Sequence, residues 1–399
     1  MAQKKADSDL VFLSAKRTPF GTFGGILKDI NPSELGAACA KAAIAQAGVD
    51  AKEIQHVVIG SVLQSTADAI YVARHIGLKS GIPIEVPALA VNRLCGSGFQ
   101  VLIEAQHQML AGDTELALVG GVENMSLTPY VLRGVRFGTK MGHSQVEDYL
   151  FAALSDSYTG SPMAITAENL GEKYAITRAQ VDEHALLSQA RTKAANEKGY
   201  FKDEIAPYSS TDKKGNVTTV SNDEHPKPGT TIENLNKLKA VFKENGLVTA
   251  GTASGIVDGA ACMVVASAGY ASKKNLKPLG RLVSYGICGV DPNIMGIGPA
   301  PAARQALARA GLSLDQMDLV EVNEAFAAQY LAVEKELQLD RAKTNVNGGA
   351  IAIGHPLAAS GTRITSHLLY ELKRRGQRYG LGSACIGGGQ GIAVIVEAY

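Results

Sequence analysis

The chain of 399 residues has no tryptophan, few cysteines and no excess of either charge. Its 39 lysines and arginines are balanced by 38 aspartates and glutamates, so no overall field favours nucleic acid as a partner. No apolar run is long enough to span a membrane. The start of the chain, residues 1–9, is polar and lacks the apolar segment of a secretory signal, which indicates a cytosolic protein. We therefore expect a small molecule as the partner.

The five cysteines are scattered and odd in number, without paired close spacing. This pattern excludes a disulfide framework and a zinc knuckle, so we expect no metal site and a reducing compartment. Cys39, Cys262 and Cys288 lie in apolar runs, where a free cysteine usually serves as a small packing residue. Cys95 and Cys385 differ from them, because glycines follow both closely.

The chain is rich in what a large globular protein needs, with 46% hydrophobic residues and 43 glycines. Its length exceeds one ordinary core, which predicts two or more packed domains. Strand-like runs alternate with helical patterns, as is typical of a layered α/β architecture. The strand-like runs cover 10–15, 56–62, 86–91 and 115–120, and the helical patterns cover 33–47 and 98–111.

An internal repeat relates the first and last parts of the chain. Residues 43–54 resemble residues 306–317, and Ser97-Gly98 recurs as Ser360-Gly361, an offset of 360 minus 97, or 263. A short strand follows each copy, at 115–120 and at 378–383. We therefore expect a duplicated α/β unit, with an N-terminal half of residues 1–121 plus about 254–277 and a C-terminal half of residues 278–399.

Residues 122–253 have no counterpart in the repeat. They are rich in charged and turn residues and include a hairpin-like turn at 212–216. We expect an inserted loop domain that helps to form the substrate pocket, because connections vary while the scaffold holds the geometry. The alternative is an insertion that only decorates the surface.

Glycine-rich loops surround the candidate reactive residues. Cys95 lies in the motif Asn-Arg-Leu-Cys-Gly-Ser-Gly (92–98), Cys385 opens Cys-Ile-Gly-Gly-Gly-Gln-Gly (385–391), and His355 lies in Gly-His-Pro (354–356). Glycine allows the backbone to approach a ligand closely. Two such cysteines and a histidine indicate thiol chemistry on acyl groups.

The offset of 263 also relates the motifs to one another. It places Gly60 opposite Asn323 and Val122 opposite Cys385, and it places Cys95 opposite Ala358, just after His355. Equivalent loops of two related halves face each other across a pseudo-twofold axis. Cys95 from one half could therefore meet Asn323, His355 and Cys385 from the other. Singly, His355 could be a core histidine, Asn323 a helix cap and Cys385 a packing residue.

Together with Asn-Glu-Ala-Phe (323–326), these motifs resemble in order and spacing the four active-site motifs of the thiolases. The resemblance covers nearly the whole chain, including residues 15–21 and 166–169. Residues 135–140 and 295–299 resemble the mitochondrial type of 3-ketoacyl-CoA thiolase, a pattern that bacterial relatives share. The resemblance implies a thiolase-like α/β fold, with two duplicated halves in an αβαβα arrangement and an inserted loop domain.

The resemblance also implies a mechanism. Cys95 would attack the 3-keto carbon as a thiolate, with its pKa lowered by a helix amino terminus near Gly96 and by His355. Cys385 would protonate the departing acetyl-CoA enolate and then deprotonate the incoming CoA, in a ping-pong sequence. The backbone amides of Cys95 and Gly387 would form one oxyanion hole. His355 and a water held by Asn323 would form a second one.

For CoA, the resemblance indicates contacts from Lys227, Thr230 and Ser254. Lys227 stands where arginine is common, so a point charge replaces a bidentate fork, and the alternative is a solvated turn lysine. Three further residues would line the pantetheine and acyl pocket: Met163, Ala325 and Phe326. Acyl-CoA and CoA are then the substrates, and we expect no resident cofactor.

Two departures from the family pattern bear on the substrate. Pro-Met-Ala (162–164) stands where short-chain acetoacetyl-CoA thiolases usually have His-Met-Gly, and Ala358 stands where glycine is common. The first departure favours longer acyl chains, whereas Ala358 adds a methyl group near the nucleophile loop. We expect a degradative 3-ketoacyl-CoA thiolase (acetyl-CoA C-acyltransferase), as in fatty acid β-oxidation.

Three alternatives stay open. One is a biosynthetic acetoacetyl-CoA thiolase, and another is a noncatalytic acyl-CoA-binding relative. The third, a condensing ketosynthase, is disfavoured by Cys385. The resemblance further implies a homotetramer built as a dimer of dimers, or a homodimer. It places the enzyme in a bacterial cytoplasm or, alternatively, in the mitochondrial matrix.

Overall fold

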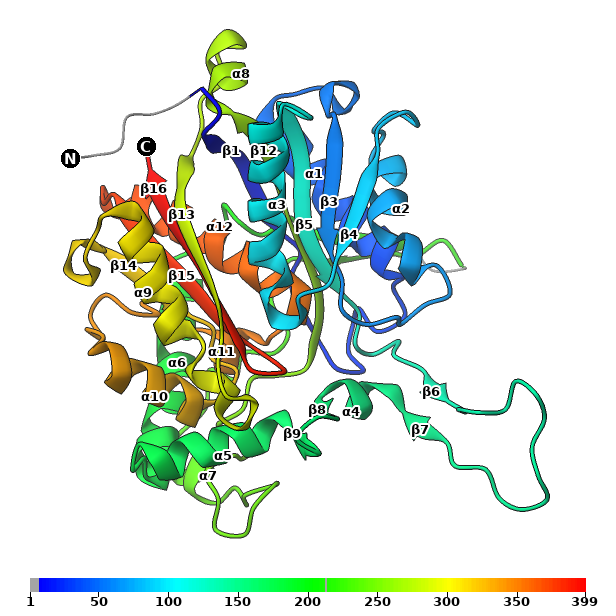
Figure 1. Cartoon of the computed structure of the whole chain (residues 1–399), viewed down its shortest axis with the longest axis vertical. Helices are drawn as coiled ribbons and strands as arrows, with labels where there is room; N and C mark the ends of the chain where they lie inside the picture. The colour runs from blue at the N-terminus through cyan, green and yellow to red at the C-terminus, as the bar shows by residue number, and fades with distance from the viewer. Residues whose placement is uncertain (1–6, 212–213) are drawn as a thin grey trace.

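The computed structural model describes residues 7–211 and 214–399. Its main sheet runs in the order β14-β15-β16-β13-β1-β12-β5-β3-β4, with β2 paired to β12 (Figure 1). The N-terminal half contributes β1 (Leu10–Arg17), β2 (Gly21–Thr22), α1 (Pro32–Ala47), β3 (His56–Gly60), α2 (Val72–Lys79), β4 (Ala88–Val91), α3 (Ser97–Ala111), β5 (Leu116–Glu123), β12 (Val257–Ser267) and α8 (Ala268–Lys273). The C-terminal half contributes β13 (Gly280–Gly289), α9 (Pro299–Ala310), β14 (Leu319–Val322), α10 (Ala327–Leu337), α11 (Ala350–Ile353), α12 (Leu357–Arg375), β15 (Tyr379–Ile386) and β16 (Gln390–Ala398).

The expected repeat is confirmed by the strands. β15 begins at 379 and ends at 386, and β5 begins at 116 and ends at 123, so the offset is 263 at both ends. The order β3-β5-β12-β1 in one half matches β14-β15-β16-β13 in the other. The two halves share one sheet, because a short antiparallel pairing of β1 with β13 joins them at Val11↔Arg281 and Phe12↔Gly280.

Three hydrophobic clusters define the layers. In the middle cluster, α3 and α12 pack between strands of both halves. α1 and α2 cover the outer face of the N-terminal half, and α9 and α10 cover that of the C-terminal half. The two halves of the shared sheet thus lie on either side of α3 and α12. The resulting order is helix, half-sheet, helix, half-sheet, helix, as expected, with α3 and α12 at the centre of the molecule in Figure 1.

The two central helices cross where the repeat places a glycine in each. A Cβ added to Gly98 would lie 2.5 Å from the carbonyl oxygen of Ala358, and one added to Gly361 would collide with the backbone nitrogen of Phe99. Only glycine permits so close an approach of two helix starts. This crossing brings the residues before α3, which include Cys95, next to the residues before α12, which include His355.

The insertion leaves the sheet after β5 and returns at β12, two strands that pair directly with each other. It contains α4 (Tyr149–Ala153), α5 (Met163–Lys173), α6 (Arg178–Glu197), α7 (Ile232–Asn236) and the short strands β6 (Tyr130–Val131), β7 (Glu147–Asp148), β8 (Ser155–Asp156), β9 (Ser161–Pro162), β10 (Tyr208–Thr211) and β11 (Val217–Val220). α5 and α6 pack on α10. The predicted turn at 212–216 connects β10 and β11, and its residues 212 and 213 lie outside the described part of the chain.

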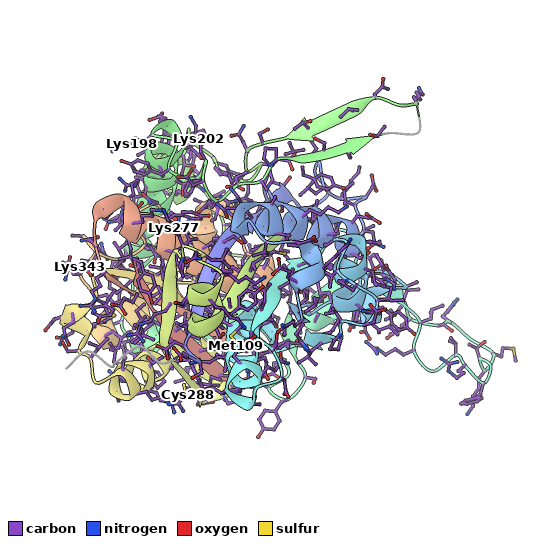
Figure 2. All side chains as sticks on the ribbon, turned by 90° about the horizontal axis from the view of Figure 1, so that it is seen from above. Met109, Lys198, Lys202, Lys277, Cys288 and Lys343 are labelled. Atoms are coloured by element: carbon purple, nitrogen blue, oxygen red, sulfur yellow. The ribbon has the colours of Figure 1, made fainter. Side chains whose placement is uncertain are left out.

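Two segments of the insertion stand away from the body. Figure 2 shows the β10–β11 hairpin as one projection and a long loop as another. We refer to this loop, residues 132–147, as the arm. No helix in the described part of the chain is long and apolar enough to cross a membrane.

Candidate active site

A cavity of about 480 Å³ lies where the loops of both halves meet the insertion. Most of the predicted site residues line it: Cys95, His355, Cys385, Gly387, Met163, Ser254, Ala325 and Phe326. Asn323 stands behind His355, buried to 1% exposure. Lys227 and Thr230 are not among the lining residues.

Cys95 sits in a strained turn at the start of α3. The preceding residue, Leu94, has a φ of 47°, a left-handed conformation that is rare for leucine. The Asn92 Oδ1 accepts a hydrogen bond from the Leu94 N–H at 3.0 Å. The Ser97 Oγ accepts from the Arg93 N–H at 2.9 Å and donates to the Leu94 carbonyl at 2.8 Å. These side chains hold the turn, which presents the thiol to the cavity.

The electrostatics of Cys95 differ from the sequence-based expectation. Burial raises the pKa of the thiol to about 11, although the backbone N–H groups of Gly387 and of Cys95 itself act to lower it. The expected lowering of the Cys95 pKa is therefore wrong, because desolvation outweighs the helix start and the amide donors. The two N–H groups do lie at the sulfur, as the predicted oxyanion hole requires.

His355 is a neutral imidazole in this site. Burial, aided by the charge of Arg363, lowers its pKa to about 3. Its Nδ1 lies 2.6 Å from the Ser360 Oγ, and its Nε2 lies 3.4 Å from the Asn323 Nδ2. When Nδ1–H donates to Ser360, Nε2 keeps a lone pair and can accept a proton. Among the residues that the structure describes, the buried Asn323 Oδ1 has no hydrogen-bond partner, so it can hold a water.

Cys385 is the penultimate residue of β15, beside the hairpin turn that leads into β16. It pairs in register with Gly391, and the turn between them contains Gly388 and Gly389 with φ values of 78° and 84°. Its thiol is buried, and both burial and the nearby Cys95 raise its pKa above the usual range. Cys385 therefore holds its proton firmly at neutral pH.

The predicted CoA contacts separate into two groups. Ser254 lies at the cavity because the end of the insertion pairs with the Asn-Glu-Ala-Phe loop, where the Ser254 N–H donates to the Ala325 carbonyl at 3.0 Å. Lys227 is exposed on a turn outside the cavity wall. Its N–H donates to Gln189 Oε1, and the Thr230 Oγ donates to its carbonyl oxygen at 2.8 Å. The structure thus brings Ser254 into the site but not Lys227 or Thr230.

Several residues of the cavity are not apparent from the sequence motifs. The insertion and the adjoining loops supply an apolar wall that includes Met125, Phe151, Leu154, Phe242 and Met295. Glu123, behind Cys95, was also missed. The repeat could have indicated Glu123, because the offset of 263 places the preceding residue, Val122, opposite Cys385.

A duplicated α/β fold in which each half contributes a cysteine to one shared cavity defines a class of thiol-dependent acyltransferases. The comparisons agree with this class. The thiolase N-terminal domain family matches residues 10–269, and the thiolase C-terminal domain family matches residues 276–398. The chain belongs to the thiolase family.

Individual relatives span nearly the whole chain. The mitochondrial 3-ketoacyl-CoA thiolase of Homo sapiens is 56% identical over 387 residues, which are 97% of each protein. An acetyl-CoA acetyltransferase of Pseudomonas aeruginosa is 47% identical over 97% of this chain and 98% of its own. The crystal structure of the human mitochondrial 3-ketoacyl-CoA thiolase in complex with CoA superposes with a TM-score of 0.96, at 54% identity and over 99% of both chains. The relatives thus include mitochondrial and bacterial enzymes.

Proposed function

We propose that the chain is an acetyl-CoA C-acyltransferase that cleaves 3-ketoacyl-CoA with CoA to give acetyl-CoA and a shortened acyl-CoA. The observation that carries this proposal is the meeting of Cys95, Cys385 and His355 in one largely apolar cavity. One thiol can carry the acyl group while the second moves protons. The reaction needs CoA as a substrate and no resident cofactor.

The first half-reaction begins with proton transfer from the Cys95 thiol to His355 Nε2. The thiolate attacks the 3-keto carbon, and the N–H groups of Cys95 and Gly387 stabilise the oxyanion. The bond between carbons 2 and 3 then breaks, which leaves an acyl group on Cys95. The electron pair of that bond forms the acetyl-CoA enolate, which takes a proton from Cys385.

The second half-reaction returns the protons. The Cys385 thiolate accepts the proton of the incoming CoA thiol, and the CoA sulfur attacks the acyl-Cys95 thioester. Collapse of the tetrahedral adduct releases the shortened acyl-CoA, and Cys95 regains the proton held by His355. A water on Asn323, together with His355, stabilises the enolate oxygen. The same steps in reverse perform a Claisen condensation.

The cavity wall supports a substrate longer than four carbons. Phe151, Leu154, Met163 and Phe242 offer apolar surface beyond the two thiols. The 56% identity with enzymes named 3-ketoacyl-CoA thiolase points in the same direction. A short-chain acetoacetyl-CoA thiolase is the second candidate, because relatives named acetyl-CoA acetyltransferase are 47% identical. We place the enzyme in a bacterial cytoplasm, with the mitochondrial matrix as the alternative.

Cleavage of a chain-length series tests this function. With CoA present, we expect 3-ketoacyl-CoA substrates of four to sixteen carbons to lose their magnesium-enolate absorbance, and kcat/KM to be higher for six to ten carbons than for four. The reason is that each buried methylene adds roughly 0.8 kcal/mol of binding energy until the apolar wall is filled. Cleavage restricted to the four-carbon substrate would favour the short-chain enzyme, and no cleavage at any length would refute the proposal.

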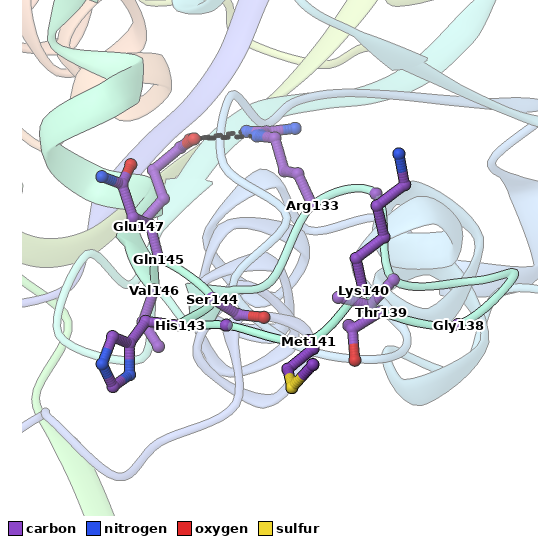
Figure 3. Close-up of a pocket in the computed structure, with 13 residues that line it drawn as sticks. Arg133, Gly138, Thr139, Lys140, Met141, His143, Ser144, Gln145, Val146 and Glu147 are labelled. Carbon is purple, nitrogen blue, oxygen red and sulfur yellow. Dashed lines mark hydrogen bonds and ion pairs between the residues drawn. The ribbon is translucent and has the colours of Figure 1, made fainter.

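We further infer a homotetramer formed by two dimers, with a homodimer as the alternative. β4 is the outermost of the described strands on its side of the sheet, and Leu89 on it is part-exposed, so a second copy can extend the sheet there. The arm carries Phe137 and Met141 with their side chains almost fully in solvent. Figure 3 shows the arm curling around an open hollow, closed at its base by the ion pair between Arg133 and Glu147.

Substitution in the arm tests the tetramer. The double variant Phe137→Glu, Met141→Glu is expected to reduce the mass measured by light scattering from that of a tetramer to that of a dimer, because it charges an apolar contact. Cleavage should stay within about twofold, since the arm lies outside the cavity. Val217→Glu, on the exposed hairpin, is the matched control and should leave the mass unchanged. An unaltered mass of the double variant would show that the arm does not join dimers.

A further inference from the structure

Glu123 is a buried carboxylic acid behind the nucleophile loop that the reaction steps above do not use. It ends β5, and its side chain is 1% exposed. Within residues 7–211 and 214–399, no cation pairs with it, and its partners are backbone N–H groups. A buried carboxyl without a cation is costly to keep, so its contacts are informative.

A chain of hydrogen bonds leads from Glu123 to the strained turn before Cys95. Its Oε1 accepts from the Val62 N–H at 2.5 Å, and its Oε2 accepts from the Leu63 N–H at 3.3 Å. The Val62 carbonyl accepts from the Asn92 Nδ2 at 3.2 Å. The Asn92 Oδ1 in turn holds the N–H of Leu94, the residue with the left-handed backbone. The carboxyl group is thus three hydrogen bonds away from the turn that presents the thiol.

Glu123 also contacts the opposite loop. The backbone N–H of Ala358, at the start of α12 and three residues after His355, stabilises its carboxylate. The same side chain therefore reaches both loops that carry the nucleophile and its base. From this position between the two halves of the fold, Glu123 can fix the loop of Cys95 relative to the loop of His355.

The charge of Glu123 bears directly on Cys95. Burial, with a smaller contribution from Asp258, raises the pKa of Glu123 to about 8, against the N–H groups of Val62, Leu63 and Ala358. The titratable groups that face it are Cys95 from the nucleophile loop and Asp258 from β12. Ionised Glu123 raises the pKa of the Cys95 thiol. Below its pKa the carboxyl is neutral and leaves thiolate formation unopposed; above it, the new negative charge opposes the thiolate.

We propose that Glu123 is a positioning residue for Cys95: it holds the strained nucleophile turn through Val62 and Asn92, and its ionisation lowers the reactivity of the thiol. The proposal rests on the nucleophilic role of Cys95. A group that performs both tasks explains why an acid is buried here without a cation. A purely structural group would hold the turn but would not change the reactivity of the thiol.

Alkylation of Cys95 by iodoacetamide, followed by peptide mass spectrometry, tests the charge effect without any substrate. Glu123→Gln keeps the size and an acceptor oxygen but cannot ionise. Between pH 8 and 10 we expect its Cys95 to be alkylated faster than that of the wild type, with a lower apparent pKa of the thiol. Asp182→Asn removes another buried carboxylate, on α6, and should leave the profile unchanged. A Glu123→Gln profile that coincides with the wild type would overturn the charge effect, even in a protein that cleaves no substrate.

A double-mutant cycle tests the positioning. Glu123→Ala and Asn92→Ala should each lower kcat/KM by ~10–100-fold, because a misplaced reacting group is costly. The double variant should be no worse than the more impaired single variant, since both changes break the same chain of hydrogen bonds. Losses that multiply would show that the two residues act separately, and the positioning role would then fail. Equal circular dichroism spectra of the variants establish that each one is folded.

Discussion

Replacing Cys95 by alanine is expected to lower kcat/KM for CoA-dependent cleavage of 3-ketoacyl-CoA by at least about 10⁴-fold. Loss of a catalytic nucleophile removes the covalent pathway entirely, and comparable losses in other enzymes reach about 10⁶-fold. In the proposed mechanism the other reactive residues of the cavity have different tasks, because Cys385 donates and accepts protons and His355 accepts the proton of the nucleophile. The enolate absorbance of the substrate measures the rate. Cys39→Ala removes a buried thiol on α1 and should retain activity within about twofold.

The acyl-enzyme supplies a second measurement of the same prediction. Without CoA, the wild type should acquire one acyl group from a 3-ketoacyl-CoA substrate and release one acetyl-CoA. Peptide mass spectrometry should place that group on Cys95 and find none in the alanine variant. An acyl group on another residue would refute Cys95 as the nucleophile. Cleavage that persists in Cys95→Ala would have the same consequence.

Much of the site was predictable because the repeat carries geometric information. The 263-residue offset predicted that loops of the two halves meet, and the crossing of α3 and α12 at Gly98 and Gly361 is the physical form of that meeting. Cys95 and His355 lie in the loops that precede α3 and α12, Cys385 lies near the end of β15, and all three open onto the same cavity. A local motif together with a symmetry relation was sufficient to bring these residues together.

The protonation states were not predictable in this way. The pKa of Cys95 depends on how completely the cavity excludes water, and its walls include Met125, Leu154 and Met295 from distant parts of the chain. The motif indicates local effects that lower the pKa of Cys95, such as the helix start. It does not indicate the desolvation, which raises the pKa by more. Lys227 lies outside the cavity, where its backbone N–H donates to Gln189 of α6, and its contact with CoA stays a prediction.

The consequence for the mechanism is that the resting pair is a thiol and a neutral imidazole. Burial raises the pKa of Cys95 to about 11 and lowers that of His355 to about 3, so neither group is charged at neutral pH. An ion pair must then form only when the substrate carbonyl occupies the site and its developing oxyanion meets the N–H groups of Cys95 and Gly387. Such a site spends no energy on a buried charge before the reaction begins.

Replacing Cys385 by alanine is expected to lower kcat for cleavage by about 10²–10⁴-fold, the usual contribution of a general acid or base. The acetyl-CoA enolate would lack its proton donor, and the incoming CoA would lack its base, so both half-reactions should slow. The enolate assay measures cleavage, and acyl-enzyme formation in the absence of CoA isolates the first half. Cys385→Ser keeps the shape but offers a much weaker acid, and we expect it to be nearly as impaired.

Cys95 should stay reactive in Cys385→Ala. This result would distinguish loss of the general acid from disruption of the whole active site. Cys385 lies close enough to Cys95 for their charges to interact, and its thiolate would oppose a second one beside it. Alkylation of Cys95 by iodoacetamide in Cys385→Ala should therefore proceed at least as fast as in the wild type, while turnover is lost. Equal losses of alkylation and turnover would mean that Cys385 only packs against the nucleophile loop. Turnover that persists would assign the proton transfer to another group of the cavity, such as His355.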